Sequence, residues 1–311
     1  MEQSDGRLRF SVVVPAYNES AYVGAALKAL QQQDFAGPYE IIVVDNNSTD
    51  GTAEIAASYA VTVVSEPVAG VCQARQRGTE EARGDIVVST DADTVQPSDW
   101  LSKIDQQFRS DDIVAVGGPC RFSNPSWWAD LFPQLLFRTI AALFFLTGRV
   151  FYLSATNTAF RRTAFPGYNL RMTQGGDELD LLRRLRHAGR VVWDRTNVVT
   201  TSPRRLQRGL IYSFFVSLLT YYLLAYLVNR LSSRRLLGMA PAFRQERPRR
   251  RTGWRRAVPR WSLAPIGPSV RARVGWRAGL GLAMIATTSL GLARFALPPA
   301  AHAFARLWAF L

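Results

Sequence analysis

The feature that most constrains the fold is an alternation, over residues 10–116, of short apolar runs with longer segments of helical character. The apolar runs cover residues 10–14, 41–44, 61–64, 86–89 and 113–116. The helical segments between them cover residues 19–33, 50–59, 71–82 and 97–108. Runs that are apolar along almost their whole length are typical of strands buried on both faces, in parallel sheets covered by helices. The sequence therefore predicts an α/β fold with a mostly parallel sheet flanked by helices.

Polar segments follow three of these expected strands, at residues 15–19, 45–50 and 91–93. In open α/β sheets, ligands bind beyond the carboxyl ends of the strands. Because all three segments lie at such ends, we expect them to meet in one binding site.

The third segment, Asp91-Ala92-Asp93, places two carboxylates one residue apart after a buried strand. Mg²⁺ and Mn²⁺ prefer oxygen ligands and are often shared between carboxylates and a diphosphate. Taken alone the motif is weak, because turns use Asp freely. Its position beside the other polar segments favours a divalent cation site at Asp91 and Asp93.

Two common phosphate-binding motifs are missing from the sequence. There is no G-x-G-x-x-G after the first strand, and no G-x-x-x-x-G-K-[ST] anywhere. The charge of a bound phosphate must then be met by a metal ion and by side chains such as Arg75.

The pattern changes after residue 125. Residues 127–153 are apolar but interrupted by charges, which fits a groove-forming or interfacial helix pair, or a plain core helix. A returning strand is expected at 156–162, and a helix after Gly175-Gly176. Asp177, Glu178 and Asp180 crowd the start of that helix, where its dipole favours acids. From the residues alone they are either helix-start acids or catalytic groups.

The order of these motifs resembles that of the family-2 glycosyltransferases with a GT-A fold, from about residue 10 to residue 201. The matching segments are Val12-Val13-Val14-Pro15-Ala16-Tyr17-Asn18-Glu19, residues 43–52, residues 70–78, Asp91-Ala92-Asp93, residues 157–162 and Asp177-Glu178-Leu179-Asp180-Leu181. The resemblance implies that Pro15, Tyr17 and Glu19 hold the nucleotide and that Asp45 contacts its base. It also implies metal binding by Asp93 with Asp91, and a catalytic base in the last segment.

Two departures from the family pattern affect which residue is expected to be the base and whether processive transfer is expected. The usual Glu-Asp order is Asp177-Glu178 here, so position matching makes Glu178 the base and leaves Asp177 as the alternative. Processive members carry Gln-x-x-Arg-Trp after the catalytic helix, whereas residues 203–209 contain no Trp. The resemblance then implies inverting transfer of one sugar per encounter, from a nucleotide-sugar donor to an acceptor hydroxyl.

The charge of the chain is concentrated near its C-terminal end. The net charge is +14, and residues 229–277 contain 14 Arg and one acid. We therefore expect a GT-A domain over residues 1–202, with a nucleotide-binding half at about 8–120 and an acceptor and catalytic half at about 121–202. Residues 203–311 form the expected membrane-associating region.

Two apolar segments in that region, residues 209–228 and 279–297, are expected to be hydrophobic helices. The first has the length needed to span a bilayer. Spanning would place the Arg-rich segment outside, against the positive-inside trend, if the enzyme domain is cytoplasmic. The open alternatives are that the first segment is interfacial or re-entrant and only the second spans, or that neither spans. Two other hypotheses remain for this region: a buried helix in a soluble protein, and a nucleic-acid-binding tail.

We therefore expect a membrane-associated enzyme with a cytoplasmic catalytic domain, acting on a lipid-linked or cell-envelope glycan precursor and binding no nucleic acid. The alternatives are a sugar-nucleotide nucleotidyltransferase and a degenerate, non-catalytic membrane scaffold. A nucleotidyltransferase should show a Gly-rich, basic phosphate loop directly after the strand at 10–14, and residues 15–19 do not form such a loop. Intact acids at 91, 93, 177 and 178 argue against the second.

Overall fold

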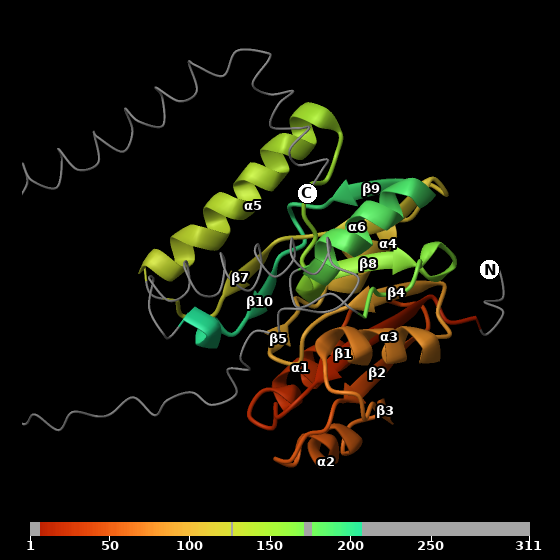
Figure 1. Cartoon of the computed structure of the whole chain (residues 1–311), viewed down its shortest axis with the longest axis vertical. Coiled ribbons are helices and arrows are strands. Elements are labelled where there is room, and N and C mark those ends of the chain that lie inside the picture. Colours follow the sequence, from red (N-terminus) through yellow and green to blue (C-terminus); the bar gives the residue numbers. More distant parts are fainter. Residues whose placement is uncertain (1–6, 126, 171–175, 207–311) are drawn as a thin grey trace, which may run out of the picture. The chain divides into compact units, whose positions relative to one another are not determined.

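The computed structural model describes residues 7–125, 127–170 and 176–206 (Figure 1). All of them belong to one compact unit. The hydrophobic helices expected at 209–228 and 279–297, and the Arg-rich segment 229–277, lie outside the described residues, so these expectations stay predictions.

A seven-stranded sheet of order β3-β2-β1-β4-β8-β6-β9 forms the centre of the described unit. Its strands are β1 (Phe10–Ala16), β2 (Tyr39–Asp45), β3 (Thr62–Ser65), β4 (Ile86–Ser89), β6 (Ile113–Gly117), β8 (Thr158–Arg161) and β9 (Arg190–Trp193). Neighbouring strands pair in parallel except at β8, which runs antiparallel to both β4 and β6. The expected mostly parallel sheet is confirmed.

Helices cover both faces of this sheet: α1 (Val23–Gln31), α2 (Thr52–Ala57), α3 (Val71–Glu81), α4 (Trp100–Gln107) and α6 (Gly176–Ala188). Successive side chains of β1 pack in two different hydrophobic clusters, one on each face of the sheet. Val12 packs in a cluster with residues of α1 and α4. Val13 packs in a second cluster with residues of α3 and α6. This two-sided burial explains why β1 is apolar along most of its length.

Helix α1 is shorter than the expected 19–33, because the chain after β1 first forms a polar loop. Asn18 has φ +54, in the left-handed region, and the backbone N–H of Glu19 donates to Thr52 Oγ1 at 2.8 Å. Helix α3 approaches the sheet closely at Gly78, where an added Cβ would lie 2.4 Å from Val13 Cγ1.

A second sheet of three short strands was not expected from the sequence. It has the order β5-β10-β7, formed by β5 (Thr94–Val95), β10 (Val199–Thr201) and β7 (Cys120–Phe122). Strand β10 pairs with the residues that directly follow Asp93. This sheet therefore carries the end of the described chain back to the acidic motif.

Residues 127–147 form one helix, α5 (Trp127–Thr147), rather than a pair. It is the long helix at the edge of the ribbon in Figure 1. Phe137 and Ile140 are buried, and the Phe137 ring stacks on Trp193 of β9 with a centroid distance of 5.7 Å. Within the described ranges, no helix is both long enough and apolar enough to cross a bilayer.

Candidate active site

The loops after β1 and β2 are joined by hydrogen bonds at the carboxyl edge of the sheet. The Asn18 N–H donates to Ser48 Oγ at 3.0 Å, and the Thr49 N–H donates to Asn18 Oδ1 at 2.7 Å. Asp45 ends β2, and its Oδ1 is buried without a hydrogen-bond partner among the described residues. A buried acceptor of this kind suits a ligand N–H, such as one on a nucleobase.

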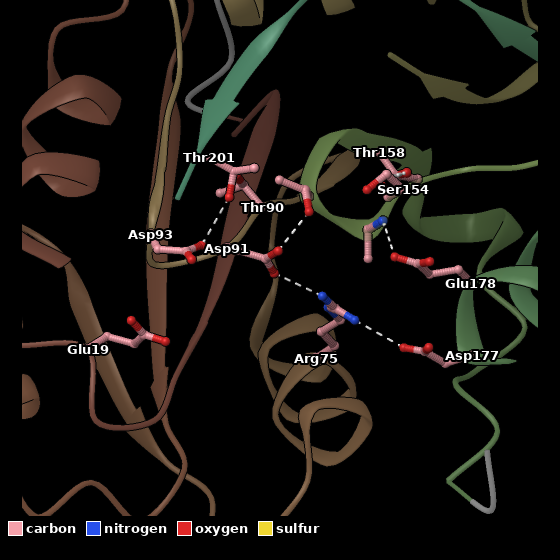
Figure 2. A network of polar contacts seen from close by, with 12 residues as sticks. Glu19, Arg75, Thr90, Asp91, Asp93, Ser154, Thr158, Asp177, Glu178 and Thr201 are labelled. Carbon is pink, nitrogen blue, oxygen red and sulfur yellow. Dashed lines mark hydrogen bonds and ion pairs between the residues drawn. The ribbon is translucent and has the colours of Figure 1, made fainter. Parts of the chain in front are cut away.

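Asp91 belongs to a buried ion-pair group centred on Arg75. The Arg75 side chain is 5% exposed and contacts Asp91 Oδ1 at 2.9 Å and Asp177 Oδ2 at 3.0 Å (Figure 2). Burial alone lowers the pKa of Arg75, but the two carboxylates outweigh it and the net pKa is raised. The structure thus places Arg75 between two acids, and its direct contact with a phosphate stays a prediction.

Asp177 and Glu178 follow each other on α6 but have different surroundings (Figure 2). The side chain of Asp177 is fully buried against Arg75. Glu178 is half-buried and accepts hydrogen bonds from Tyr152 Oη at 2.7 Å and from the Ala155 N–H at 2.8 Å. Burial, and then the charge of Asp177, raise the pKa of Glu178 to about 7, with Arg75 acting in the opposite direction. A carboxyl with this pKa suits general base catalysis near neutral pH.

A short 3₁₀ turn directly before β8, Ala155–Asn157, contacts both acidic motifs. Thr156 Oγ1 donates to Asp91 Oδ2 at 2.7 Å, and the neighbouring Ala155 donates its N–H to Glu178. Adjacent residues of one short turn thus contact the acid after β4 and the acid at the start of α6.

Asp93 belongs to a second group, which contains a residue that the sequence analysis did not select. Arg204 Nη2 lies 2.9 Å from Asp93 Oδ2 and also pairs with Glu19 Oε1. Its guanidinium lies over the ring of Tyr22, 4.8 Å from the centroid, and its side chain is 6% exposed. Arg204 follows β10, in the 3₁₀ turn Pro203–Leu206. No spacing rule reveals it, because 185 residues separate it from Glu19.

The carboxylates of this second group fit a hard divalent cation. Asp93 and Glu19 offer only oxygen ligands, which Mg²⁺ and Mn²⁺ prefer, and the guanidinium of Arg204 neutralises part of their charge. Both oxygens of Asp91 are already engaged, by Arg75 and Thr156. Over the residues that the structure describes, no three His, Cys, Asp or Glu side chains cluster as a complete metal site.

The structure thus brings most of the sequence-predicted residues to one edge of the sheet. Asp91, Arg75, Asp177 and Glu178 form one contiguous group. Asp93 and Glu19 form the second group through Arg204. Three further residues lie at the ends of β1 and β2, namely Pro15, Tyr17 and Asp45.

Comparison with known proteins gives matches over the same region. The profile of the family described as glycosyl transferase family 2 matches residues 11–168, just over half of the chain. Glycosyltransferase AglE of Haloferax volcanii is 31% identical over 123 residues, covering 37% of this chain and 40% of that protein. An undecaprenyl-phosphate 4-deoxy-4-formamido-L-arabinose transferase of Aeromonas hydrophila is 29% identical over 150 residues, covering 45% of each chain. The chain thus spans less than half of the length of either relative.

A solved structure shares the fold. The mannosyltransferase PcManGT from Pyrobaculum calidifontis, in complex with GDP-Man and Mn²⁺, superposes with a TM-score of 0.51 at 25% identity. The match covers 64% of this chain and 58% of that chain. It agrees with the expected GT-A-type arrangement of a mostly parallel sheet flanked by helices. On the extent of the profile match, the chain belongs to glycosyl transferase family 2.

Proposed function

We propose that this protein is a glycosyltransferase that moves one sugar from a nucleotide-sugar donor to an acceptor hydroxyl, with inversion. The observation that carries the proposal is the state of Glu178. This carboxyl is half-buried, oriented by two hydrogen bonds, has a pKa of about 7, and lies beside the Asp91 group. Family membership and the likeness to a mannosyltransferase in complex with GDP-Man support the same reaction.

In the proposed reaction, the acceptor oxygen attacks the anomeric carbon as its proton passes to Glu178. The bond between that carbon and the diphosphate oxygen breaks, and the nucleoside diphosphate leaves. With one base and no enzyme-bound intermediate, a single displacement inverts the anomeric centre. A positioned base of this kind contributes about 10²–10⁴-fold to the rate.

Glu178 is a better base than Asp177, because the two carboxyls have different partners. Asp177 is tied to the guanidinium of Arg75 and its side chain is fully buried. Glu178 is bound by the neutral donors Tyr152 and Ala155. Asp177 therefore serves to raise the pKa of Glu178 and to fix Arg75.

The donor is proposed to lie along the ends of β1, β2 and β4. Asp45 is assigned to the base, and Pro15, Tyr17 and Glu19 to the nucleotide loop. Asp93, with Asp91 as a more distant helper, is assigned to a Mn²⁺ or Mg²⁺ ion. Such an ion acts as a Lewis acid on the leaving diphosphate. Arg204 is the countercharge of Asp93 and Glu19 in the structure, and a bound cation would take over that role.

The acceptor is proposed to be a lipid-linked or cell-envelope glycan precursor. The Aeromonas relative is by its name an undecaprenyl-phosphate transferase, and residues 207–311 contain 17 Arg and two long apolar segments. Anionic lipid attracts such basic segments at about 1 kcal/mol per near-surface Arg. A membrane-associated enzyme with a cytoplasmic catalytic domain is consistent with both observations.

A donor screen tests this function. The full chain is melted with a panel of nucleoside diphosphate sugars, with Mn²⁺ and with EDTA, and the stabilising donors are then offered in isotope-labelled form. Sugar release or transfer that needs Mn²⁺ and is lost in Glu178→Gln is the expected result. Formation of a nucleotide sugar from a sugar phosphate and a nucleoside triphosphate would instead indicate a nucleotidyltransferase. Nucleotide binding without turnover would indicate a non-catalytic scaffold.

A further inference from the structure

A cavity of about 350 Å³ lies at the far end of α6 from the candidate active site. It is lined by the residues that follow α5, the last turn of α6 and the start of β9, including Arg149, Arg186, His187 and Arg190. We call these four residues the basic pocket. Glu178 and Arg186 are eight residues apart on α6, which corresponds to about 12 Å along the helix axis. The pocket is therefore separate from the site of the proposed reaction.

The basic pocket holds more positive charge than the described residues neutralise. Arg190 pairs with Asp112 at 2.9 Å. Neither Arg149 nor Arg186 contacts an acid anywhere in the described ranges. Partial burial, and then the charge of Arg149, lower the pKa of Arg186. Two like charges are thus held close together, an arrangement that a bound anion stabilises.

Exposed apolar side chains lie next to the basic pocket in the sequence. Phe145 is 89% exposed and Leu146 is 76% exposed, in the last turn of α5. The helix ends at Gly148, whose φ of +66 lies in the left-handed region that terminates helices. Two large apolar side chains therefore stand within four residues of Arg149. Exposed apolar groups beside unneutralised arginines are typical of surfaces that meet anionic lipid.

We propose that Phe145, Leu146 and the basic pocket dock on an anionic membrane, with a lipid headgroup phosphate held between Arg149 and Arg186. Atoms of the phosphate accept hydrogen bonds from the guanidinium groups, and the two apolar side chains enter the interface. This contact belongs to the folded unit and adds to any binding by residues 207–311. It also does not depend on the reaction proposed above.

Charge complementarity favours lipid over the C-terminal region of the chain as the occupant. Residues 207–311 contain 17 Arg and a single acidic side chain, Glu246. A region with that composition repels the basic pocket more than it neutralises it. An anionic bilayer supplies both the phosphates and the apolar layer that this surface needs.

A local probe separates this contact from binding by the C-terminal region. Leu146→Cys in the full chain is labelled with an environment-sensitive fluorophore, with labelled wild type as the background for Cys72 and Cys120. Emission is recorded with vesicles of phosphatidylcholine alone and with added phosphatidylglycerol, and sedimentation of the protein is measured in the same samples. We expect a blue shift only with the anionic vesicles.

The charge dependence is tested in the same labelled chain. Arg149→Glu combined with Arg186→Glu should abolish the blue shift, whereas Arg195→Glu, an exposed charge beyond the other end of β9, should keep it. Donor hydrolysis in solution should be unchanged in all variants, which shows that they are folded.

Three results would overturn the proposal. One is a probe that stays in a polar environment although the protein sediments with anionic vesicles, which would leave the C-terminal region as the sole membrane contact. Another is a probe already shielded in buffer, which would make another part of this chain the occupant. The third is a blue shift that survives the double charge reversal.

Discussion

The two acidic groups of the candidate site obtain their positive charge from different parts of the chain. Asp91 and Asp177 share Arg75, which is a buried residue of α3. Asp93 and Glu19 share Arg204, which lies in a 3₁₀ turn after the last strand. The first countercharge is part of the scaffold, while the second is at the end of a short strand. We infer that the first group orients the catalytic acids and that the second can exchange its countercharge for a cation.

The largest effect is expected for Glu178, the proposed base, which belongs to the first group. Glu178→Gln should lower kcat by about 10²–10⁴-fold, because the amide cannot accept the acceptor proton. Nucleotide affinity and melting temperature should change little. Steady-state transfer with a labelled donor measures the effect, and Asp177→Asn, which removes a partner of Arg75 but not the proposed base, should lower kcat less. If only the control loses kcat, Asp177 is the base.

The next effect tests the second group. Asp93→Asn should lower turnover by about 10²–10³-fold, because a metal ion contributes several kcal/mol to stabilising a leaving group. It should also weaken Mn²⁺ binding, measured by calorimetry in the presence of nucleotide. Asp91→Asn should weaken Mn²⁺ less, since both oxygens of Asp91 are engaged by protein groups. Full activity of the Asp93 variant, or of wild type in EDTA, would remove the metal assignment.

A pair of stability measurements compares the two arginines directly. Arg75→Met should lower the free energy of unfolding by about 3–5 kcal/mol, the usual cost of leaving buried charges unpaired. Arg204→Met should also destabilise the protein, but Mn²⁺ should restore its stability, by about 2.7 kcal/mol at a hundredfold excess over Kd. Denaturant unfolding with and without Mn²⁺ measures both. Equal rescue of the two variants would show that the groups do not differ in this respect.

The smallest expected effect is a pH dependence. The base must be deprotonated, so kcat/KM should rise with pH up to about 7, where Glu178 titrates. Because this pKa is raised above its unfolded value, the folded state binds the proton more tightly. The group's contribution to stability therefore declines as pH rises from the unfolded pKa to about 7. Arg75 lowers the pKa of Glu178. In Arg75→Met, the rise of kcat/KM with pH should therefore occur at higher pH. A flat profile from acid to neutral pH would contradict the assignment of the base.

Local pattern was sufficient to predict the first half of the sheet. The runs at 10–14 and 86–89 are apolar because each strand is buried on both faces, and that burial is visible in the sequence. Strands β5, β7 and β10 were missed because they contain two or three residues, too few to show a period. Their pairing depends on tertiary contacts between residues about 80–110 positions apart.

The same distinction applies to the site. Asp91 and Asp93 were selected because they stand at the end of a recognisable strand, and Glu178 because it matches the position of a family motif. Arg204 was missed because its partners, Asp93 and Glu19, are distant in the sequence. The partners of Arg75 were also not foreseen, since their choice depends on how α3 and α6 pack on one face of the sheet.

The turn before β8 acts as a spacer within the site. Ala155 contacts Glu178 and Thr156 contacts Asp91, so a single peptide unit sets the distance between the proposed base and Asp91. Because β8 is clamped between β4 and β6, the spacer cannot slide without breaking pairing on both sides. The spacing of the two acids is thereby set by strand pairing, and a change in the register of β8 would alter it.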